Sequence, residues 1–73
     1  MQNVRVLYRT EDGGSPEYDK AIQHAGRSCQ AIWVGAGTLL DTGERDNAFT
    51  VPDDRVTEFQ AKIRKLGFRV EAA

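Results

Sequence analysis

The chain has 73 residues, 40% of them hydrophobic, and its 10 basic and 11 acidic side chains give a formal net charge of −1. This length predicts one domain, residues 1–73, with one small core, and the hydrophobic fraction excludes a disordered chain. The balanced charge excludes a global attraction to nucleic acid or to an anionic membrane surface.

The first two predicted elements are a strand and a short helix. Residues Asn3 to Arg9 alternate between the two faces of a strand, and the apolar face consists of Val4, Val6 and Tyr8. Ser15-Pro16-Glu17 supplies a capping hydroxyl, a proline in the first turn and an acid beside the helix dipole. We therefore expect a helix of about ten residues that ends near Gly26. Its apolar stripe consists of Tyr18, Ala21, Ile22 and Ala25.

The middle of the chain reads as two further strands. Gln30 to Val34 forms one, and Ile32 and Val34 share one face of it while Ala31 and Trp33 share the other. Gly35-Ala36-Gly37 predicts a bulge or bend, and residues 41–46 predict a hairpin loop. Asn47 to Val51 then returns as a strand that ends at Pro52.

The most regular pattern is a second helix between Pro52 and Gly67. Its apolar residues recur at spacings of three and four, and they are Val56, Phe59, Ile63 and Leu66. Asp53 is the expected N-cap, and Gly67 stands where a left-handed residue ends a helix. A last strand follows over Phe68 to Ala72.

The order β-α-β-β-α-β predicts a ferredoxin-like α+β sandwich, a four-stranded antiparallel sheet with two helices on one face. The predicted inward residues of the strands are Val4, Val6, Ile32, Val34, Phe49, Val51, Phe68 and Val70. Those of the helices are Ile22, Phe59, Ile63 and Leu66. If residues 35–46 formed a loop, the alternative would be a three-stranded α/β sandwich.

The face of the sheet opposite the helices is the candidate binding surface. Alternation places tryptophan, leucine and three arginines on it. Tryptophan and arginine are enriched in interaction hot spots. We predict a partner-binding surface made of Arg5, Leu7, Arg9, Trp33 and Arg69. The alternative is that Trp33 packs in the core, because a slip of one residue across the Gly35 bulge reverses every side chain.

These patterns favour a non-enzymatic protein-interaction or regulatory module, such as a small bacterial or phage-type accessory protein. Its partner would be a larger protein, or a second copy bound through the open sheet face. A single-stranded nucleic-acid-binding domain is a weaker alternative, because residues 47–51 lack the basic-glycine-aromatic run of RNA-binding sheets.

A small catalytic or ligand-binding domain that uses His24 and Cys29 is the third alternative. Their spacing matches no standard zinc pattern, so we predict no metal site and no cofactor. One cysteine indicates a reducing, cytoplasmic setting. The sequence has neither the apolar core of a signal peptide nor the roughly 20 apolar residues of a membrane span.

Overall fold

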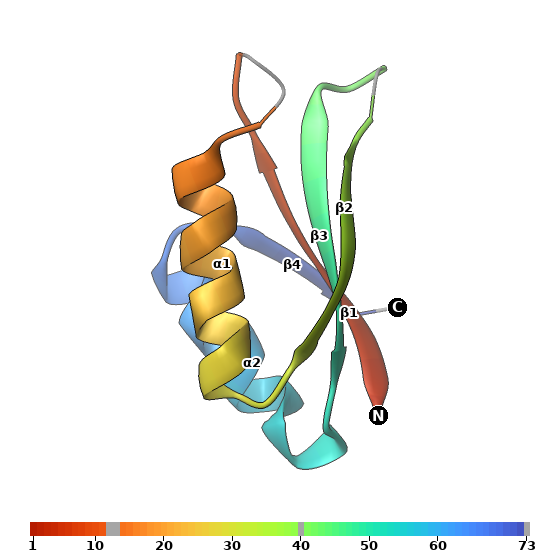
Figure 1. Cartoon of the computed structure of the whole chain (residues 1–73), viewed down its shortest axis with the longest axis vertical. Coiled ribbons are helices and arrows are strands. Elements are labelled where there is room, and N and C mark those ends of the chain that lie inside the picture. The colour runs from red at the N-terminus through yellow and green to blue at the C-terminus, as the bar shows by residue number, and fades with distance from the viewer. Residues whose placement is uncertain (12–13, 40, 73) are drawn as a thin grey trace.

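The computed structural model describes residues 1–11, 14–39 and 41–72. The four strands form one antiparallel sheet in the order β2-β3-β1-β4, and both helices cover the same face of it (Figure 1). The predicted ferredoxin-like arrangement is therefore confirmed. The elements are β1 (Gln2–Arg9), α1 (Pro16–Ser28), β2 (Ile32–Thr38), β3 (Glu44–Val51), a 3-10 turn (Asp53–Arg55), α2 (Val56–Lys65) and β4 (Arg69–Ala72).

The core lies between the sheet and the two helices. Phe49 and Phe59 meet edge to face at its centre, with ring centroids 5.1 Å apart. Gly26 approaches so closely that an added Cβ would stand 2.7 Å from the Phe49 ring, which explains the glycine inside α1. The other fully buried apolar side chains are Val4, Val6, Ile22, Cys29, Val51 and Ile63. Phe68 and Val70 pack against this cluster from β4 and the turn before it.

The predicted end of α1 at Gly26 is wrong, because the helix continues to Ser28. Gln30 adopts the left-handed conformation, with φ of 59°. The N–H of Ala31 donates to the carbonyl of Gly26 over 2.8 Å, and that of Gln30 donates to Arg27 over 3.1 Å. This is the hydrogen-bond pattern of a Schellman motif, and it closes α1 without a glycine at the left-handed position.

Of the two predicted ends of α2, one is confirmed and the other is wrong. Gly67 has φ of 94°, and the N–H of Phe68 donates to the Ile63 carbonyl, so the predicted glycine stop is confirmed. The Asp53 cap is wrong. Asp53 begins the 3-10 turn, and no side chain caps either that turn or α2. The turn absorbs three residues between Pro52 and the first residue of the helix.

The hairpin between β2 and β3 is longer than predicted. β2 runs through the glycines to Thr38, and β3 begins at Glu44 instead of Asn47. This rules out the three-stranded alternative. The predicted irregularity is present as a register shift between Trp33 and Gly35.

Three of the predicted inward residues are wrong. Ile32 and Val34 are 59% and 64% exposed, because the register of β2 turns Ile32 to the open face and leaves Val34 as the extra residue of the bulge. Leu66 is 49% exposed, because it is the C-cap of α2 and lies beyond the edge of the core. The remaining predicted inward residues are buried or pack against the core.

Candidate functional site

The outer edge of β2 is the most apolar exposed segment of the described chain. β2 lies at one edge of the sheet, and its sequence Ile-Trp-Val-Gly-Ala-Gly-Thr contains neither a charged residue nor a proline. Ile32, Trp33 and Val34 are three consecutive large side chains, and each is about half exposed or more. We call the strand Ile32–Thr38, with its side that faces away from β3, the β2 edge.

Trp33 is held on the helix-covered face of the sheet. It pairs with buried Phe49 of β3, and its indole N–H donates to Oδ1 of Asn47 over 3.1 Å. Asn47 is fully buried, so its polar side chain requires partners inside the protein. This bond orients the ring while 47% of the residue stays exposed.

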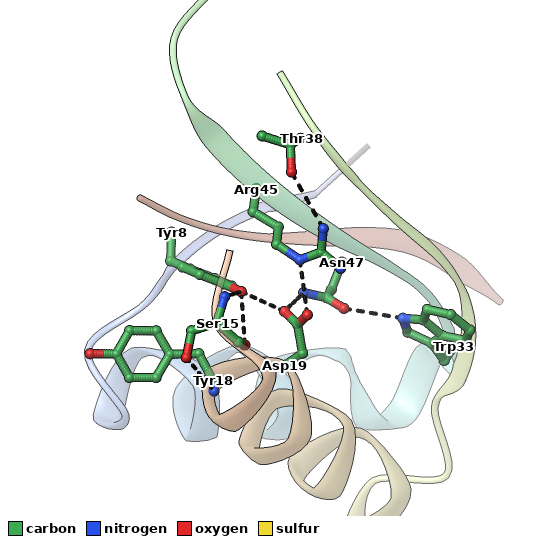
Figure 2. Close-up of polar contacts among 8 residues, drawn as sticks. All are labelled: Tyr8, Ser15, Tyr18, Asp19, Trp33, Thr38, Arg45 and Asn47. Carbon is green, nitrogen blue, oxygen red and sulfur yellow. Dashed lines mark hydrogen bonds and ion pairs between the residues drawn. The ribbon is translucent and has the colours of Figure 1, made fainter. Parts of the chain in front are cut away.

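Asn47 belongs to a polar cluster between α1 and the sheet, which we call the Asp19 cluster (Tyr8, Asp19, Trp33, Arg45 and Asn47; Figure 2). The Asp19 carboxylate of α1 accepts from the Tyr8 hydroxyl over 2.6 Å and from the Asn47 amide over 3.0 Å. Its second oxygen accepts from Nε of Arg45 over 2.9 Å. One carboxylate thereby ties α1 to β1 and β3, and through Asn47 to the β2 edge.

The protonation of Asp19 reflects these bonds. Burial acts to raise the pKa of its carboxyl, but the hydrogen bonds from Tyr8, Asn47 and Arg45 and the charge of Arg45 outweigh it, so the pKa lies below its ordinary value. Burial and the bond to Asp19 raise the pKa of the Tyr8 hydroxyl. Around neutral pH the Asp19 carboxyl is therefore ionised and accepts hydrogen bonds, and the Tyr8 hydroxyl keeps its proton and donates one.

Sequence reasoning missed this cluster, although one signal was available. Asn47 alternates with Phe49 and Val51 along β3, so the pattern that turned those residues inward also turned Asn47 inward. A buried asparagine needs several partners. Tyr8 on β1 and the acid one turn into α1 were the polar residues within reach of that face.

The predicted binding surface of Arg5, Leu7, Arg9, Trp33 and Arg69 does not lie on one face. Arg5, Leu7 and Arg9 occupy the open face, as predicted, because they pair with open-face residues of β3. Arg69 of β4 pairs with Leu7 and therefore lies on the same face. Trp33 is on the covered face. The alternation of β2 could not choose between its faces, since both carry apolar side chains, and the bulge then shifts the register.

Two of the open-face arginines are neutralised by acids. Arg5 lies 3.1 Å from Glu71 and 3.7 Å from Asp46. Arg69 lies 3.0 Å from Glu44 and 3.3 Å from Glu71. We call these five residues the open-face cluster. Its charges largely cancel, which weakens the attraction that a nucleic-acid backbone would feel.

Leu7 is only 3% exposed although it points to the open face. Its neighbours across the sheet are Asp46 and Arg69, and the ion pair of Arg69 with Glu44 of β3 spans the strand β1 that carries it. The long side chains therefore shield it from water. Leu7 is not available as a contact, while Arg9 at the end of β1 is exposed.

His24 and Cys29 are not brought together. His24 is exposed on α1, whereas Cys29 is fully buried at the end of that helix. The Cys29 thiol donates to Glu58 of α2 over 3.2 Å, and burial together with this bond raises its pKa. A thiol held protonated in this way is a poor nucleophile.

No family model matches the chain, and no curated protein matches it. The structure is similar to the crystal structure of a copper-binding domain from HMA7, a P-type ATPase, with a TM-score of 0.53 and 14% sequence identity. The match covers the whole of this chain and 95% of that one. At this identity the likeness shows a shared fold and nothing more.

The residues of this chain do not fit a copper site. Copper(I) prefers thiolate and thioether ligands, and the chain has one cysteine and one methionine. Cys29 is buried and bonded to Glu58. Within residues 1–11, 14–39 and 41–72, no group of three or more histidine, cysteine or acidic side chains could hold a metal ion. The same residues include no helix long and apolar enough to cross a membrane.

Proposed function

We propose that the protein is a non-enzymatic protein-interaction module that associates through the β2 edge, and that its partner there is a second copy of the same chain. The observation that carries this proposal is the absence of charge from an edge strand with three large exposed apolar side chains, Ile32, Trp33 and Val34. An edge strand offers free backbone N–H and C=O groups to a further strand.

The β2 edge has few of the features that keep sheet edges apart. Proteins usually protect an edge with lysine or another charge, with proline, with a bulge or with a very short strand. Of these, β2 has only the bulge at Val34. The opposite edge is different: β4 has four residues, and Arg69 and Glu71 are two of them. Strand addition is therefore favoured at β2.

A second copy suits this strand because of its charge. When two identical strands pair antiparallel about a two-fold axis, each segment faces itself, so a charge near the axis would face the same charge. Ile32–Thr38 contains none. Pairing would join the two sheets into one continuous sheet and would bury Ile32 on its open face. The half-exposed ring of Trp33 would contribute from the covered face.

Solution mass tests the proposal. Sedimentation equilibrium from low to high micromolar concentration is expected to give twice the monomer mass for the wild type. Ile32→Lys is expected to give a monomer, because it places a charge on an edge strand in place of an apolar side chain that the pairing would bury. Leu66→Lys is the matched control, because it also replaces an exposed apolar residue with lysine but lies at the C-cap of α2, away from β2, and it is expected to stay dimeric.

Two results would contradict the proposal. A wild-type monomer at every concentration would exclude the self-pairing, and a dimer that survives Ile32→Lys would exclude the β2 edge. Circular dichroism of each variant establishes that a change of mass is not caused by unfolding.

A further inference from the structure

A groove between the two helices lies on the side of the molecule away from the sheet. It has a volume of about 540 Å³ and is lined by Ala21, His24 and Ala25 of α1 and by Lys62, Lys65 and Leu66 at the end of α2. We call it the interhelical groove. It is separate from the β2 edge and shares no residue with it.

The floor of the interhelical groove is apolar and is formed on the α1 side by small side chains. Ala21 and Ala25 are one turn apart on α1, and their small side chains leave room for another backbone to approach. Leu66 is half exposed beside them, and it also lines a second depression of about 400 Å³ together with half-exposed Tyr18. The apolar part of the interhelical groove therefore consists of Ala21, Ala25 and Leu66.

The rim of the interhelical groove is basic. Lys62 donates to the Ser28 hydroxyl over 2.8 Å and lies 3.8 Å from Glu58. Lys65 makes no ion pair with any residue that the structure describes. His24 borders the same groove from α1. An occupant with acidic side chains at its edges would face these lysines, and an occupant with basic ones would be repelled.

The backbone of the occupant must be hydrogen-bonded within itself. Both walls of the groove are helices, whose backbone groups are already paired, so they offer no ladder to an extended strand. An α-helix satisfies its own backbone groups and can lay an apolar stripe into such a groove. Large aliphatic residues spaced three and four apart would reach Ala21, Ala25 and Leu66.

We infer that the interhelical groove binds an amphipathic α-helix of a partner protein, with aliphatic residues along one stripe and glutamate or aspartate beside it. This site lies beyond the proposed pairing through β2. If both are correct, a dimer joined at β2 would present two such grooves.

The inference is tested with a fluorescein-labelled helical peptide of about 18 residues, which exceeds the roughly 15 residues that an isolated helix needs. It carries leucine at every third and fourth position and glutamate at the flanking ones. Fluorescence anisotropy is expected to show binding to the wild type. In ¹⁵N-¹H correlation spectra, the shifts are expected to gather at Ala21, Ala25 and Leu66.

Two variants of the same helix turn separate groove charge from overall charge. Lys65→Glu reverses a charge on the rim, and we expect at least about a threefold weaker affinity, in the range of a lost surface ion pair and a new repulsion. Arg64→Glu makes the same change of net charge, but Arg64 does not line the groove. Its affinity is expected to equal that of the wild type.

The inference is overturned if the acidic peptide does not bind up to millimolar concentration, or if a peptide with lysine in place of glutamate binds equally well. Equal weakening by Arg64→Glu and Lys65→Glu would also overturn it, as would shifts that gather on β2. Ile32→Lys is expected to bind the peptide like the wild type. Loss of the dimer and loss of the groove are therefore distinguishable results.

Discussion

Two clusters that each contain arginine–carboxylate pairs lie on opposite faces of the sheet. The Asp19 cluster lies under α1, and the Asp19 carboxylate receives hydrogen bonds from three side chains of two strands. The open-face cluster lies on the bare side of the sheet, where Arg5 and Arg69 are 44% and 57% exposed. In the first cluster water can replace a lost partner only in part, because Asp19 and Arg45 have 16% and 26% of their side chains exposed, whereas in the second cluster water can replace it readily.

The comparison explains why the charged residues do not mark a binding surface on this sheet. On the open face, acids and arginines cancel and shield Leu7. On the covered face, the Asp19 cluster uses its polar groups to orient Trp33 next to the β2 edge. The apolar side chains Ile32, Trp33 and Val34 of the β2 edge are about half exposed or more, and they are the basis of the proposed function.

Asp19→Ala should give the largest effect. Arg45, the Asn47 amide and the Tyr8 hydroxyl would all lose an acceptor, and Asp19 has only 16% of its side chain exposed. Breaking a buried pair costs about 3–5 kcal/mol, and partial access of water reduces this to about 2–4 kcal/mol of the free energy of unfolding. Urea unfolding, followed by circular dichroism, measures the change.

The matched control for that variant is Glu71→Ala on the open-face cluster. It also removes one carboxylate from two ion pairs, but an exposed pair contributes less than about 1 kcal/mol. Equal losses in the two variants would show that the two clusters do not differ in the way their burial indicates.

Trp33→Phe should have an intermediate effect. The ring is kept but the indole N–H is lost, which leaves Oδ1 of buried Asn47 without its donor. The expected loss is about 1–3 kcal/mol of the free energy of unfolding. At a protein concentration at which the chain is monomeric, Val34→Ala at the neighbouring exposed position is expected to change the free energy of unfolding by less than about 0.5 kcal/mol. If the phenylalanine variant were as stable as the wild type, the hydrogen bond from Trp33 to Asn47 would contribute nothing to the free energy of unfolding.

The smallest effect on the free energy of unfolding is expected from the protonation of Asp19 at low pH. The folded-state pKa of Asp19 is lowered, so its contribution to stability is fully present above the unfolded-state pKa and is lost as pH falls through the folded-state value. The relevant window therefore begins near the ordinary value of 3.8 and extends below it. A protonated Asp19 keeps its place and some of its bonds, so the loss is smaller than that of Asp19→Ala.

Asp19→Asn isolates this contribution. The urea midpoints of wild type and variant are compared from pH 5 downward, and their difference is expected to shrink as Asp19 becomes protonated. A difference that stays constant down to the most acidic pH would contradict the lowered pKa of Asp19.

The amino-acid pattern alone was sufficient for the topology. Ser15 and Pro16 at the start of α1, Gly67 at the end of α2 and the alternation of β1 are local signals, because they depend on backbone geometry and on neighbours in sequence. The same signals were sufficient for most of the core. The prediction that Leu66 lies in the core was wrong, because the regular helical spacing of apolar residues continues to the C-cap of α2, beyond the edge of the core.

The face of Trp33 was decided only by tertiary structure. Ile32, Trp33 and Val34 are all apolar, so alternation along β2 assigns neither face, and a bulge of one residue determines which side chains turn inward. That bulge belongs to the pairing of β2 with β3, and it leaves the indole of Trp33 where it donates to Asn47. Asn47 is in turn oriented by Asp19, 28 residues earlier in the chain. Such contacts are long-range, and no local pattern of residues contains them.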